Sequence, residues 1–282
     1  MGVPLRLPER LTDRAIVLDG HSLGDAEAHW EGEDAEMVRR FEAPGRATLQ
    51  QIESAIARWI DARATGAPMF VYALRVDGVL AGGCELRWLE QPEGALNLSY
   101  WCYPAFRGRG LVGRAVTLVM RAAAAIPGAR QVEAHIDFDN TASRNVAMRA
   151  GFREQGAVVD SVANGEGTTT RARYVKPLVH GIDVGDETRC AHWRSALDVV
   201  AIKMKCCAIY YACKDCHDAL AGHVAEVWPR AEWAEPAVLC GVCGYEMSVR
   251  IYLDCANVCP ACAAPFNPGC RNHYHYYFES DR

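Results

Sequence analysis

The chain has 282 residues, half of them hydrophobic, and a formal net charge of −5 at pH 7. This length and composition are sufficient for two domains, each with its own core. Neither half of the chain carries the excess of basic residues that phosphate neutralisation requires, so we expect no nucleic-acid partner. No run of 18 apolar residues occurs, so we expect no membrane span. Residues 1–14 are polar and lack the apolar segment of a signal peptide, which predicts a cytoplasmic protein.

The first 180 residues alternate between helical and strand patterns. Apolar residues at helical spacing predict an amphipathic helix over residues 49–64. Two apolar-rich strands, 69–76 and 79–89, flank Asp77-Gly78, a strong hairpin turn. The next pattern predicts a strand over residues 96–103, followed by a helix that ends at residue 125. A further strand is predicted over 132–138 and a short helix over 141–150.

A glycine-rich turn, Arg107-Gly-Arg-Gly-Leu-Val-Gly-Arg114, separates the strand at 96–103 from the next helix. Such a turn exposes backbone N–H groups at the positive end of the helix dipole, which suits a phosphate-bearing cofactor. The turn has neither the Lys-Ser/Thr of a P-loop nor the glycine spacing of a dinucleotide-binding fingerprint. By itself, it is explained equally well as a surface turn.

With its context, the turn resembles the GNAT acetyltransferases. The segments NLSYWCYPAFRGRGLVGRAV and DNTASRNVAMRAGF are similar to the branch that includes the ribosomal-protein N-terminal acetyltransferases. The resemblance covers most of residues 6–178 and implies an α/β fold with a mixed central sheet flanked by helices. It also implies direct transfer of an acetyl group from acetyl-CoA to an amine. We therefore expect residues 1–178 to form a GNAT-like acetyltransferase domain.

The resemblance also implies where acetyl-CoA binds. The glycine-rich turn would hold the pyrophosphate through Arg109, Gly110, Leu111, Val112, Gly113 and Arg114, although the family prefers Gly or Ala where this chain has Val112. The strand that ends at Cys102 and Tyr103 would lend a backbone N–H to the thioester oxygen. Asn140 would lie near the pantetheine arm.

The catalytic groups are partly implied by the same resemblance. Ser143 would lie near the sulfur and protonate the leaving thiolate; the tyrosine acid usual in the family is replaced by Ala147. A base must remove the ammonium proton, and Asn97 stands where several relatives have Glu. Glu85 on the neighbouring strand is our candidate, with Glu133 behind it. The alternatives are a water chain as the base, and Glu85 as a residue of the hairpin face or of a salt bridge.

The acceptor is predicted only as a class. It is an amine-bearing small molecule or a protein N-terminus, with lysine and aminoglycosides also open. Six acidic residues between 25 and 36 could attract a cationic amine or peptide N-terminus, or could form a solvated helix face.

Cysteine is concentrated in the last third of the chain, where eleven of the thirteen lie between Cys190 and Cys270. In a reducing compartment, dense cysteine pairs are more often metal ligands than disulfides. Two C-x-x-C pairs, Cys240/Cys243 and Cys259/Cys262, are separated by fifteen residues, which matches a zinc pattern. We expect residues 184–282 to form a small zinc-stabilised domain.

The order of the candidate ligands resembles the CHY-type zinc finger family over residues 181–279. The resemblance implies three structural zinc ions held by twelve residues: Cys190, His192, Cys206, Cys207, Cys213, Cys216, His217, His223, Cys240, Cys243, Cys259 and Cys262. The spacing does not show how the first eight divide between two ions. Four further residues, Cys255, Cys270, His273 and His275, are interpreted as packing residues.

Two functions follow as hypotheses. The first is an acetyl-CoA-dependent N-acetyltransferase whose zinc domain docks a protein partner or the substrate. The second is a catalytically weak GNAT fold that acts as a zinc-dependent protein-binding module, an alternative that Asn97, Val112 and Ala147 keep open.

Overall fold

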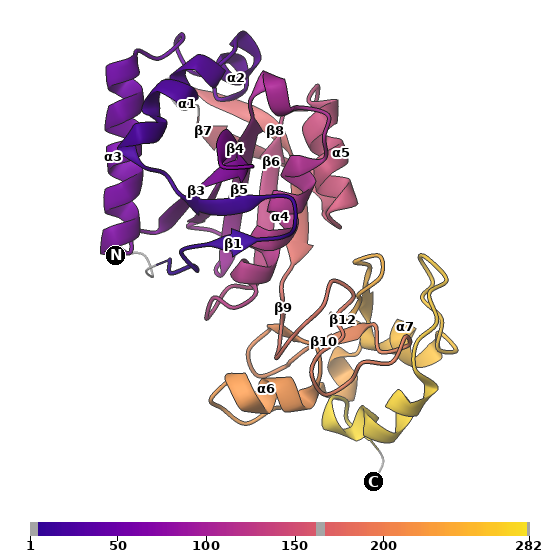
Figure 1. Ribbon diagram of the computed structural model, residues 1–282. Helices are drawn as coiled ribbons and strands as arrows, with labels where there is room; N and C mark the ends of the chain where they lie inside the picture. Colours follow the sequence, from indigo (N-terminus) through magenta and orange to yellow (C-terminus); the bar gives the residue numbers. More distant parts are fainter. Residues whose placement is uncertain (1–4, 162–166, 281–282) are drawn as a thin grey trace. The chain divides into compact units, whose positions relative to one another are not determined.

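The computed structural model describes residues 5–161 and 167–280, which form two compact units (Figure 1). The first unit contains the described residues up to Ile126 together with Gln131–Lys176, and the second contains Pro127–Arg130 and the residues from Pro177 onward. Within the described ranges, no helix is long and apolar enough to cross a membrane.

The first unit is built on an eight-stranded sheet in the order β1-β2-β3-β4-β5-β6-β8-β7. Its strands are β1 (Leu11–Thr12), β2 (Val17–Gly20), β3 (Met69–Val76), β4 (Val79–Trp88), β5 (Ala95–Cys102), β6 (Gln131–Ile136), β7 (Arg153–Ser161) and β8 (Thr168–Pro177). Its helices are α1 (Ala26–Gly32), α2 (Ala35–Arg40), α3 (Leu49–Thr65), α4 (Leu111–Ala123) and α5 (Thr141–Arg149), with short 3₁₀ turns η1 (Leu23–Asp25) and η2 (Pro104–Phe106). The α/β class with a mixed sheet is confirmed, as are the elements predicted between residues 49 and 150.

Local sequence explains where these elements begin and end. The Thr48 side chain accepts a hydrogen bond from Gln51 N, and the Gln51 side chain accepts one from Thr48 N, so a capping box starts α3. The helix ends at Gly66, whose φ of 71° is left-handed. Asp77 and Gly78 also have positive φ, 50° and 81°, as the tight turn between β3 and β4 requires.

The sheet opens between its fifth and sixth strands. Parallel pairing of β5 with β6 joins Ala95–Asn97 to Gln131–Glu133, the first residues of each strand. The antiparallel pairing of β5 with β4 continues to Cys102. The later residues of β5 and β6 are therefore free to line the two walls of a groove.

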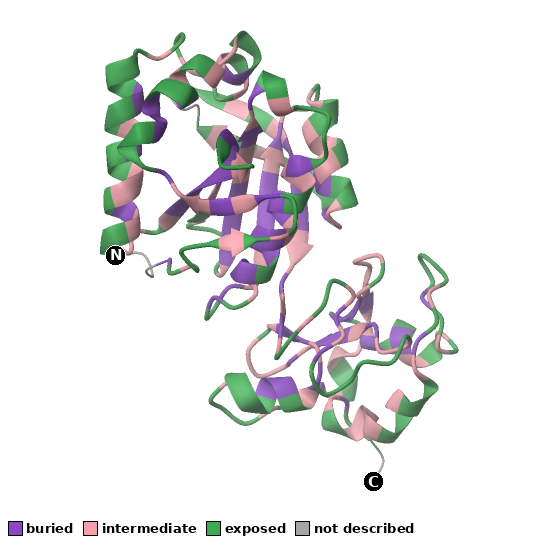
Figure 2. Cartoon of the chain, viewed as in Figure 1, coloured by how far each residue is buried: buried purple, intermediate pink, exposed green. Residues whose placement is uncertain are grey.

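Helices cover both faces of this sheet (Figures 1 and 2). Along β3, Val71 and Ala73 point to one face, where they pack with Met37 of α2 and Trp59 of α3. Trp101 of β5 belongs to the same cluster. Tyr100 must point to the opposite face, and its hydroxyl contacts α5, which itself contacts α4. The α2–α3 layer and the α4–α5 layer thus lie on opposite faces of the sheet.

The second unit contains a five-stranded sheet in the order β13-β12-β10-β11-β9. Its strands are β9 (Val179–His180), β10 (Val200–Lys203), β11 (Tyr210–Tyr211), β12 (Pro236–Cys240) and β13 (Glu246–Ser248). Its helices are α6 (Lys214–Leu220) and α7 (Val249–Asp254), with 3₁₀ segments η3 (Arg230–Glu232) and η4 (Pro268–Tyr276). The buried residues include Trp228, Tyr252, Phe266 and Phe278, which share one cluster with five of the cysteines.

The first unit also buries two histidines. His21 is 3% exposed, its ring contacts Trp59 and Trp101, and neither ring nitrogen has a hydrogen-bond partner among the described residues. His29 is buried beside it and its Nδ1 lies 2.7 Å from the Tyr103 hydroxyl. Burial lowers the pKa of His21 to about 3 and that of His29 to about 4, so both rings are neutral at pH 7.

This burial predicts a loss of stability in mild acid. Below pH 6.5 the unfolded chain takes up a proton at residue 21 that the folded chain does not accept until about pH 3. The free energy of unfolding should then fall by about 1.4 kcal/mol per pH unit for this residue alone. His21→Leu should remove that slope between pH 6.5 and 4. Hydrogen exchange of β2 and β3 peptides, compared between wild type and variant at each pH, measures the difference; equal slopes would contradict the prediction.

Candidate functional site

A groove of about 640 Å³ lies where β5 and β6 separate. Its walls come from both strands, from α2, from the start of α4 and from α5. The predicted site residues that line it are Glu85, Cys102, Leu111, Val112, Asn140 and Ser143. Tyr103, Arg109, Gly110, Gly113 and Arg114 are not among its lining residues. The predicted cofactor and catalytic residues are thus brought to one region, although only part of them face the groove.

The glycine-rich turn ends in a helix N-terminus at the groove. Gly110 is the N-cap of α4 and has a φ of 73°, a conformation that favours glycine. The Arg114 N–H donates to the Gly110 carbonyl at 3.3 Å, as the first bond of the helix. A helix leaves the N–H groups before that bond without intrahelical partners, here those of Leu111, Val112 and Gly113. These donors and the helix dipole form a site suited to an anion.

The three arginines of the turn have different surroundings. Arg107 donates to both carboxylate oxygens of Asp34, at 2.7 and 2.9 Å, and to the Cys102 carbonyl at 3.0 Å. Arg114 donates to Asp13 at 2.8 Å, and Arg109 lies over the ring of Phe106. Arg107, which was not assigned from the sequence, is the one of the three that lines the groove.

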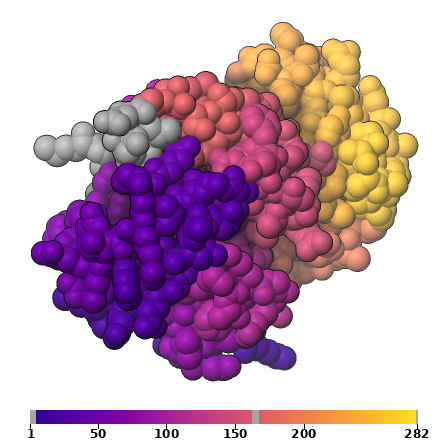
Figure 3. Space-filling view, turned by 90° about the horizontal axis from the view of Figure 1, so that it is seen from above, coloured from indigo at the N-terminus to yellow at the C-terminus, as the bar shows by residue number. Residues whose placement is uncertain are grey.

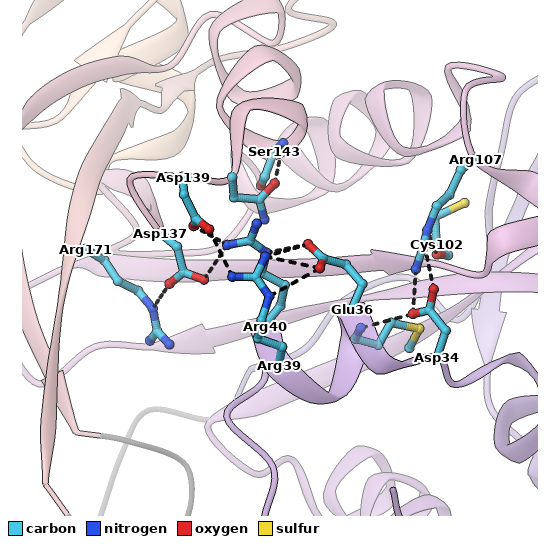
Figure 4. Close-up of polar contacts among 12 residues, drawn as sticks. Asp34, Glu36, Arg39, Arg40, Cys102, Arg107, Asp137, Asp139, Ser143 and Arg171 are labelled. Carbon is cyan, nitrogen blue, oxygen red and sulfur yellow. Dashed lines mark hydrogen bonds and ion pairs between the residues drawn. The ribbon is translucent and has the colours of Figure 1, made fainter. Parts of the chain in front are cut away.

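Ion pairs fix α2 beside the groove (Figure 4). Arg40 contacts Asp137 at 3.0 Å and also pairs with Asp139, while Arg39 reaches Asp139 at 2.9 Å. After α2, Glu42 pairs with Arg171 of β8 at 2.9 Å. In the space-filling view the indigo surface of residues 5–45 meets the magenta-to-pink surface of residues 100–150 (Figure 3). The groove is therefore bordered by α2 on one side and by α4, the helix that follows the glycine-rich turn, on the other.

Four of the six acidic residues between 25 and 36 have partners within the domain, among them Glu33, which accepts a hydrogen bond from Ala47 N at 3.0 Å. Asp25 is buried and holds Arg75 through two contacts of 2.8 and 2.9 Å. Asp34 caps α2 and binds Arg107, and Glu36 binds Arg39 and Arg40. Glu27 and Glu31 remain exposed, so only part of the acidic charge of this segment is engaged within the domain, and attraction of a cationic acceptor stays a prediction.

On the α5 side, three polar groups form a connected set. Asn140 is the N-cap of α5, and its Oδ1 accepts a hydrogen bond from Ser143 N at 3.0 Å. The Ser143 hydroxyl donates to the Tyr100 hydroxyl at 2.8 Å, and the Tyr100 hydroxyl donates to the Ser143 carbonyl at 3.1 Å. Burial raises the pKa of Tyr100 to about 12, so the phenol keeps its proton at pH 7. This contact was not predicted from the sequence, because it joins residues 43 positions apart.

On the other face, Glu85 is the carboxylate best suited to act as a base. It lies directly across from Ser99 of β5 and lines the groove, with its side chain 25% exposed. Burial raises its pKa, against a smaller opposite effect of Arg87, whose Nε is 3.9 Å away. Burial also acts to raise the pKa of Glu133, but hydrogen bonds from His135 and Arg173 outweigh it and lower the pKa to about 2. Glu133 is therefore a structural anion and a poor base.

His135 is a groove residue that the sequence did not single out. Its Nε2 lies 3.0 Å from Glu133 and its Nδ1 lies 3.0 Å from Asp160. Burial lowers its pKa, but hydrogen bonds to the two carboxylates outweigh this effect and raise it overall. Both ring nitrogens of His135 thus contact carboxylates, which favours the protonated form of the ring in the wall of the groove.

The amides at the end of β5 point in alternate directions. The Tyr103 N–H donates to the Ala81 carbonyl at 2.9 Å, on the β4 side, and its hydroxyl is engaged with His29. Successive N–H groups of a strand alternate in direction, so the Cys102 N–H points toward the opening between β5 and β6. Cys102 and Tyr103 were both predicted to donate a backbone N–H to the cofactor. Of these two, Cys102 has the geometry to donate to a group in the groove.

In the second unit, the twelve predicted metal ligands gather into three groups of four. The first group is Cys190, His192, Cys213 and Cys216; the second is Cys206, Cys207, His217 and His223; the third is Cys240, Cys243, Cys259 and Cys262. The ligand atoms within each group lie within 4.8 Å of one another. The structure thus divides the first eight residues between two sites, which the spacing had left open.

The distances within each group fit a tetrahedral zinc ion. Zinc–sulfur bonds of about 2.3 Å place two thiolates about 3.8 Å apart. The Sγ–Sγ distances are 3.6 Å for Cys190 and Cys213, and 3.9 and 3.8 Å for the pairs Cys240/Cys262 and Cys243/Cys259. His217 and His223 approach through their Nε2 atoms, 3.3 Å apart. His223 Nδ1 contacts the Ala221 carbonyl at 2.8 Å, which orients the ring as a metal ligand requires.

Backbone geometry at the cysteine turns favours ligation as well. Cys207, Cys243 and Cys262 are each followed by a residue in the left-handed region: Ala208 (φ 57°), Gly244 (φ 71°) and Ala263 (φ 60°). This conformation costs a residue with a β-carbon roughly 1–2 kcal/mol. Four protein ligands close each site, so the sites are structural rather than catalytic. The donor sets and distances fit three structural zinc ions.

The remaining cysteines and histidines of this unit form no fourth group among the described residues. Cys255 Sγ donates to the Tyr252 carbonyl at 3.1 Å. Cys270 and His273 line a separate cavity of about 310 Å³, where the His273 ring contacts Trp193. His275 packs against the ring of Tyr276. These contacts agree with packing roles for the four residues.

Comparisons with known proteins match the two units separately. Residues 16–153 match the acetyltransferase (GNAT) domain family, and residues 190–267 match the CHY zinc finger family, which confirms both resemblances. Helper of Tim protein 13 of Saccharomyces cerevisiae is 42% identical over 109 residues, which cover 38% of this chain and 94% of that protein.

Two solved structures share the fold of the first unit. A putative ribosomal-protein-serine acetyltransferase from Vibrio cholerae has a TM-score of 0.52 at 13% identity, over 60% of this chain and 97% of that one. The Microcin C7 self immunity acetyltransferase MccE, solved in complex with acetyl-CoA and AMP, has a TM-score of 0.51 at 16% identity, over 58% and 93%. At these identities the likeness extends to the fold alone.

The zinc sites predict a metal dependence limited to the second unit. Structural zinc contributes on the order of 10 kcal/mol per site in small fingers, so chelation should unfold residues 184–282. Cys243→Ser should reduce the zinc content from three ions per chain to two and raise hydrogen exchange around residues 240–262. Elemental analysis under reducing, chelator-free conditions measures the content.

The matched control is Cys255→Ser, which changes a cysteine outside the three groups and keeps a hydroxyl for the Tyr252 carbonyl. It should retain three zinc ions. Fewer than two ions in the wild type, or three in Cys243→Ser, would refute the assignment.

Proposed function

Because the chain belongs to the GNAT acetyltransferases through residues 16–153 and to the CHY zinc finger family through residues 190–267, we propose that it is an acetyl-CoA-dependent N-acetyltransferase with a zinc-stabilised docking domain. The observation that carries the proposal is the groove between β5 and β6, which has an anion site at one end and proton-transfer groups on both sides.

The cofactor follows the groove from the α4 N-terminus to Ser143. The N–H groups of Leu111, Val112 and Gly113 bind the pyrophosphate, and Arg107 supplies a positive charge beside them. The Asn140 side chain has its Oδ1 engaged in capping α5, so its NH₂ group is available to the pantetheine arm. The Cys102 N–H donates to the thioester oxygen. Tyr103 does not share this role, because its N–H donates to the Ala81 carbonyl.

The acid and the base act from opposite faces of the sheet. Glu85 removes a proton from the acceptor ammonium, and its raised pKa keeps it a better base than an exposed carboxylate. The amine then attacks the thioester carbonyl carbon directly. Ser143, on the α5 side, delivers a proton to the departing sulfur. No covalent enzyme intermediate is required, so Cys102 serves through its backbone.

The acceptor is an amine, either a protein N-terminus, a lysine or a small amine. The zinc domain binds a protein partner or the protein substrate. Support for a protein partner comes from Helper of Tim protein 13, which is matched over nearly its full length and whose name describes it as a helper of another protein. The same match supports the second candidate, a protein-binding module on a weakly active acetyltransferase fold.

The cofactor assignment is tested by Gly110→Glu, which should abolish CoA binding. A Cβ at this position meets nothing within 4 Å, so the new carboxylate enters open space at the pyrophosphate site and repels it. Gly78→Glu is the matched control, because Gly78 has a similar φ of 81°, equally open surroundings and a place in the β3–β4 turn. Calorimetry with CoA measures both. Wild-type affinity in Gly110→Glu would contradict the assignment.

The Asp34–Arg107 pair predicts a second effect on the cofactor. Asp34 competes with the pyrophosphate for Arg107, so Asp34→Asn should bind CoA more tightly, by up to about fivefold as for an exposed ion pair. Asparagine still caps α2, which keeps the helix in place. Glu36→Gln is the control, since it removes pairs to Arg39 and Arg40 but not to Arg107. Weaker CoA binding by Asp34→Asn would show that Asp34 holds Arg107 in its binding position.

A further inference from the structure

The hydroxyl groups of Tyr100 and Ser143 form a pair at the floor of the groove. Ser143 Oγ lies 2.8 Å from the Tyr100 hydroxyl, and the Ser143 carbonyl lies 3.1 Å from it. Both residues line the groove. Ala147 follows Ser143 by four residues on the same face of α5 and is buried. Because alanine has no polar side-chain group, α5 supplies no second hydroxyl there. The phenol at this place comes from β5 instead of α5.

We propose that Tyr100 is the proton source behind Ser143, so that the two hydroxyls form a relay to the sulfur of CoA. The inference rests on the proposed function, since it requires CoA in the groove. Tyr100 acts through Ser143 and is therefore a positioning residue for the departing thiolate.

The relay needs only rotation of two hydroxyl hydrogens. When sulfur occupies the groove, the Ser143 O–H turns from Tyr100 to the sulfur. The Tyr100 O–H turns from the Ser143 carbonyl to Ser143 Oγ, which is the closer acceptor by 0.3 Å (3.1 less 2.8 Å). The chain of donors then runs in one direction, and each donor strengthens the next.

The electrons and protons balance along this route. As the amine nitrogen forms its bond to the acetyl carbon, the carbon–sulfur bond breaks and its electron pair moves to sulfur. The sulfur takes the Ser143 proton, and Ser143 takes the Tyr100 proton. Tyr100 regains a proton from solvent at the groove. The nitrogen loses two protons, which Glu85 passes to solvent one after the other: the ammonium proton before the attack and a second one as the amide forms. The net products are the amide, CoA thiol and one proton.

The surroundings of Tyr100 keep it in the donor form. The titratable neighbours that affect it, besides Ser143, are Cys84 of β4 and Tyr174 of β8. Burial raises the pKa of the Cys84 thiol to about 12 and also raises the pKa of Tyr174, so both are neutral at pH 7. Glu85 points to the opposite face, as Ser99 does, and so does not face the phenol. Among the described residues, no carboxylate, arginine, lysine or histidine is one of the groups that shift the pKa of Tyr100, so the phenol remains protonated and able to donate.

The test uses the full chain with CoA itself as the probe, so no acceptor is needed. Calorimetry gives the affinity for CoA, and the ultraviolet absorbance of the thiolate, followed against pH, gives the ionisation of the bound thiol. In the wild type the bound thiol should ionise at lower pH than free CoA. Tyr100→Phe should keep the CoA affinity and reduce the thiolate-to-thiol ratio at a given pH by about fivefold, as expected for one lost hydrogen bond.

Ser143→Ala should reduce the ratio at least as much, and the double variant should equal Ser143→Ala, because Tyr100 acts through Ser143. Tyr72→Phe is the matched control: Tyr72 is a buried tyrosine of β3 whose hydroxyl donates to the Pro8 carbonyl, away from the groove, and it should behave as wild type.

Three results would overturn the relay. They are a wild-type thiol titration in Tyr100→Phe, a loss of CoA affinity in that variant, which indicates a structural role, or additive effects in the double variant. Failure of the wild type to bind CoA is a different result, because it removes the proposed function and the relay with it.

Discussion

The separation of β5 from β6 is the constraint on which the first unit depends. A parallel pair that closed along its whole length would bury the amides of Leu98–Cys102 in a ladder and leave no space between the strands. Instead, β5 and β6 pair only as far as Asn97, while β5 remains paired with β4 as far as Cys102. The hydrogen-bonding capacity that the ladder does not use becomes the lining of a groove. Backbone groups that a sheet would normally satisfy internally are thus left for a ligand.

Holding the strands apart requires contacts on both sides of the opening. Ion pairs from Arg40 to Asp137 and Asp139 join α2 to the segment that follows β6, and Arg107 joins Asp34 to the cofactor turn (Figure 4). Each exposed pair is worth little alone, but a network with several shared partners restricts the position of α2 more strongly. Asp34 and Glu36, two of the acidic residues between 25 and 36, take part in this restraint.

The sequence predicted what is local and missed what depends on register. The Asp77-Gly78 turn and the C-x-x-C pairs are determined within a few residues, and the structure contains both. The division of the first eight zinc ligands is different, because Cys216 and His217 are adjacent in sequence and belong to different groups. Adjacent residues on a helix point about 100° apart, so α6 sends one ligand to each site. The spacing of the ligands in the sequence therefore does not predict which ligands share a zinc ion.

Register also explains the distribution of the proton-transfer groups. Glu85 lies across from Ser99, and Tyr100 is the next residue along β5, so the proposed base and the phenol are one position apart in the ladder but on opposite faces. In a closed sheet these groups would be separated by the backbone layer. Because β6 has moved away, both faces open onto one groove, and a reacting centre between them can lose a proton on one side and receive one on the other. Under the proposed mechanism, Ala147 needs no polar side chain for this reason: the open strand carries the Tyr100 phenol to the side of α5 where Ser143 lies.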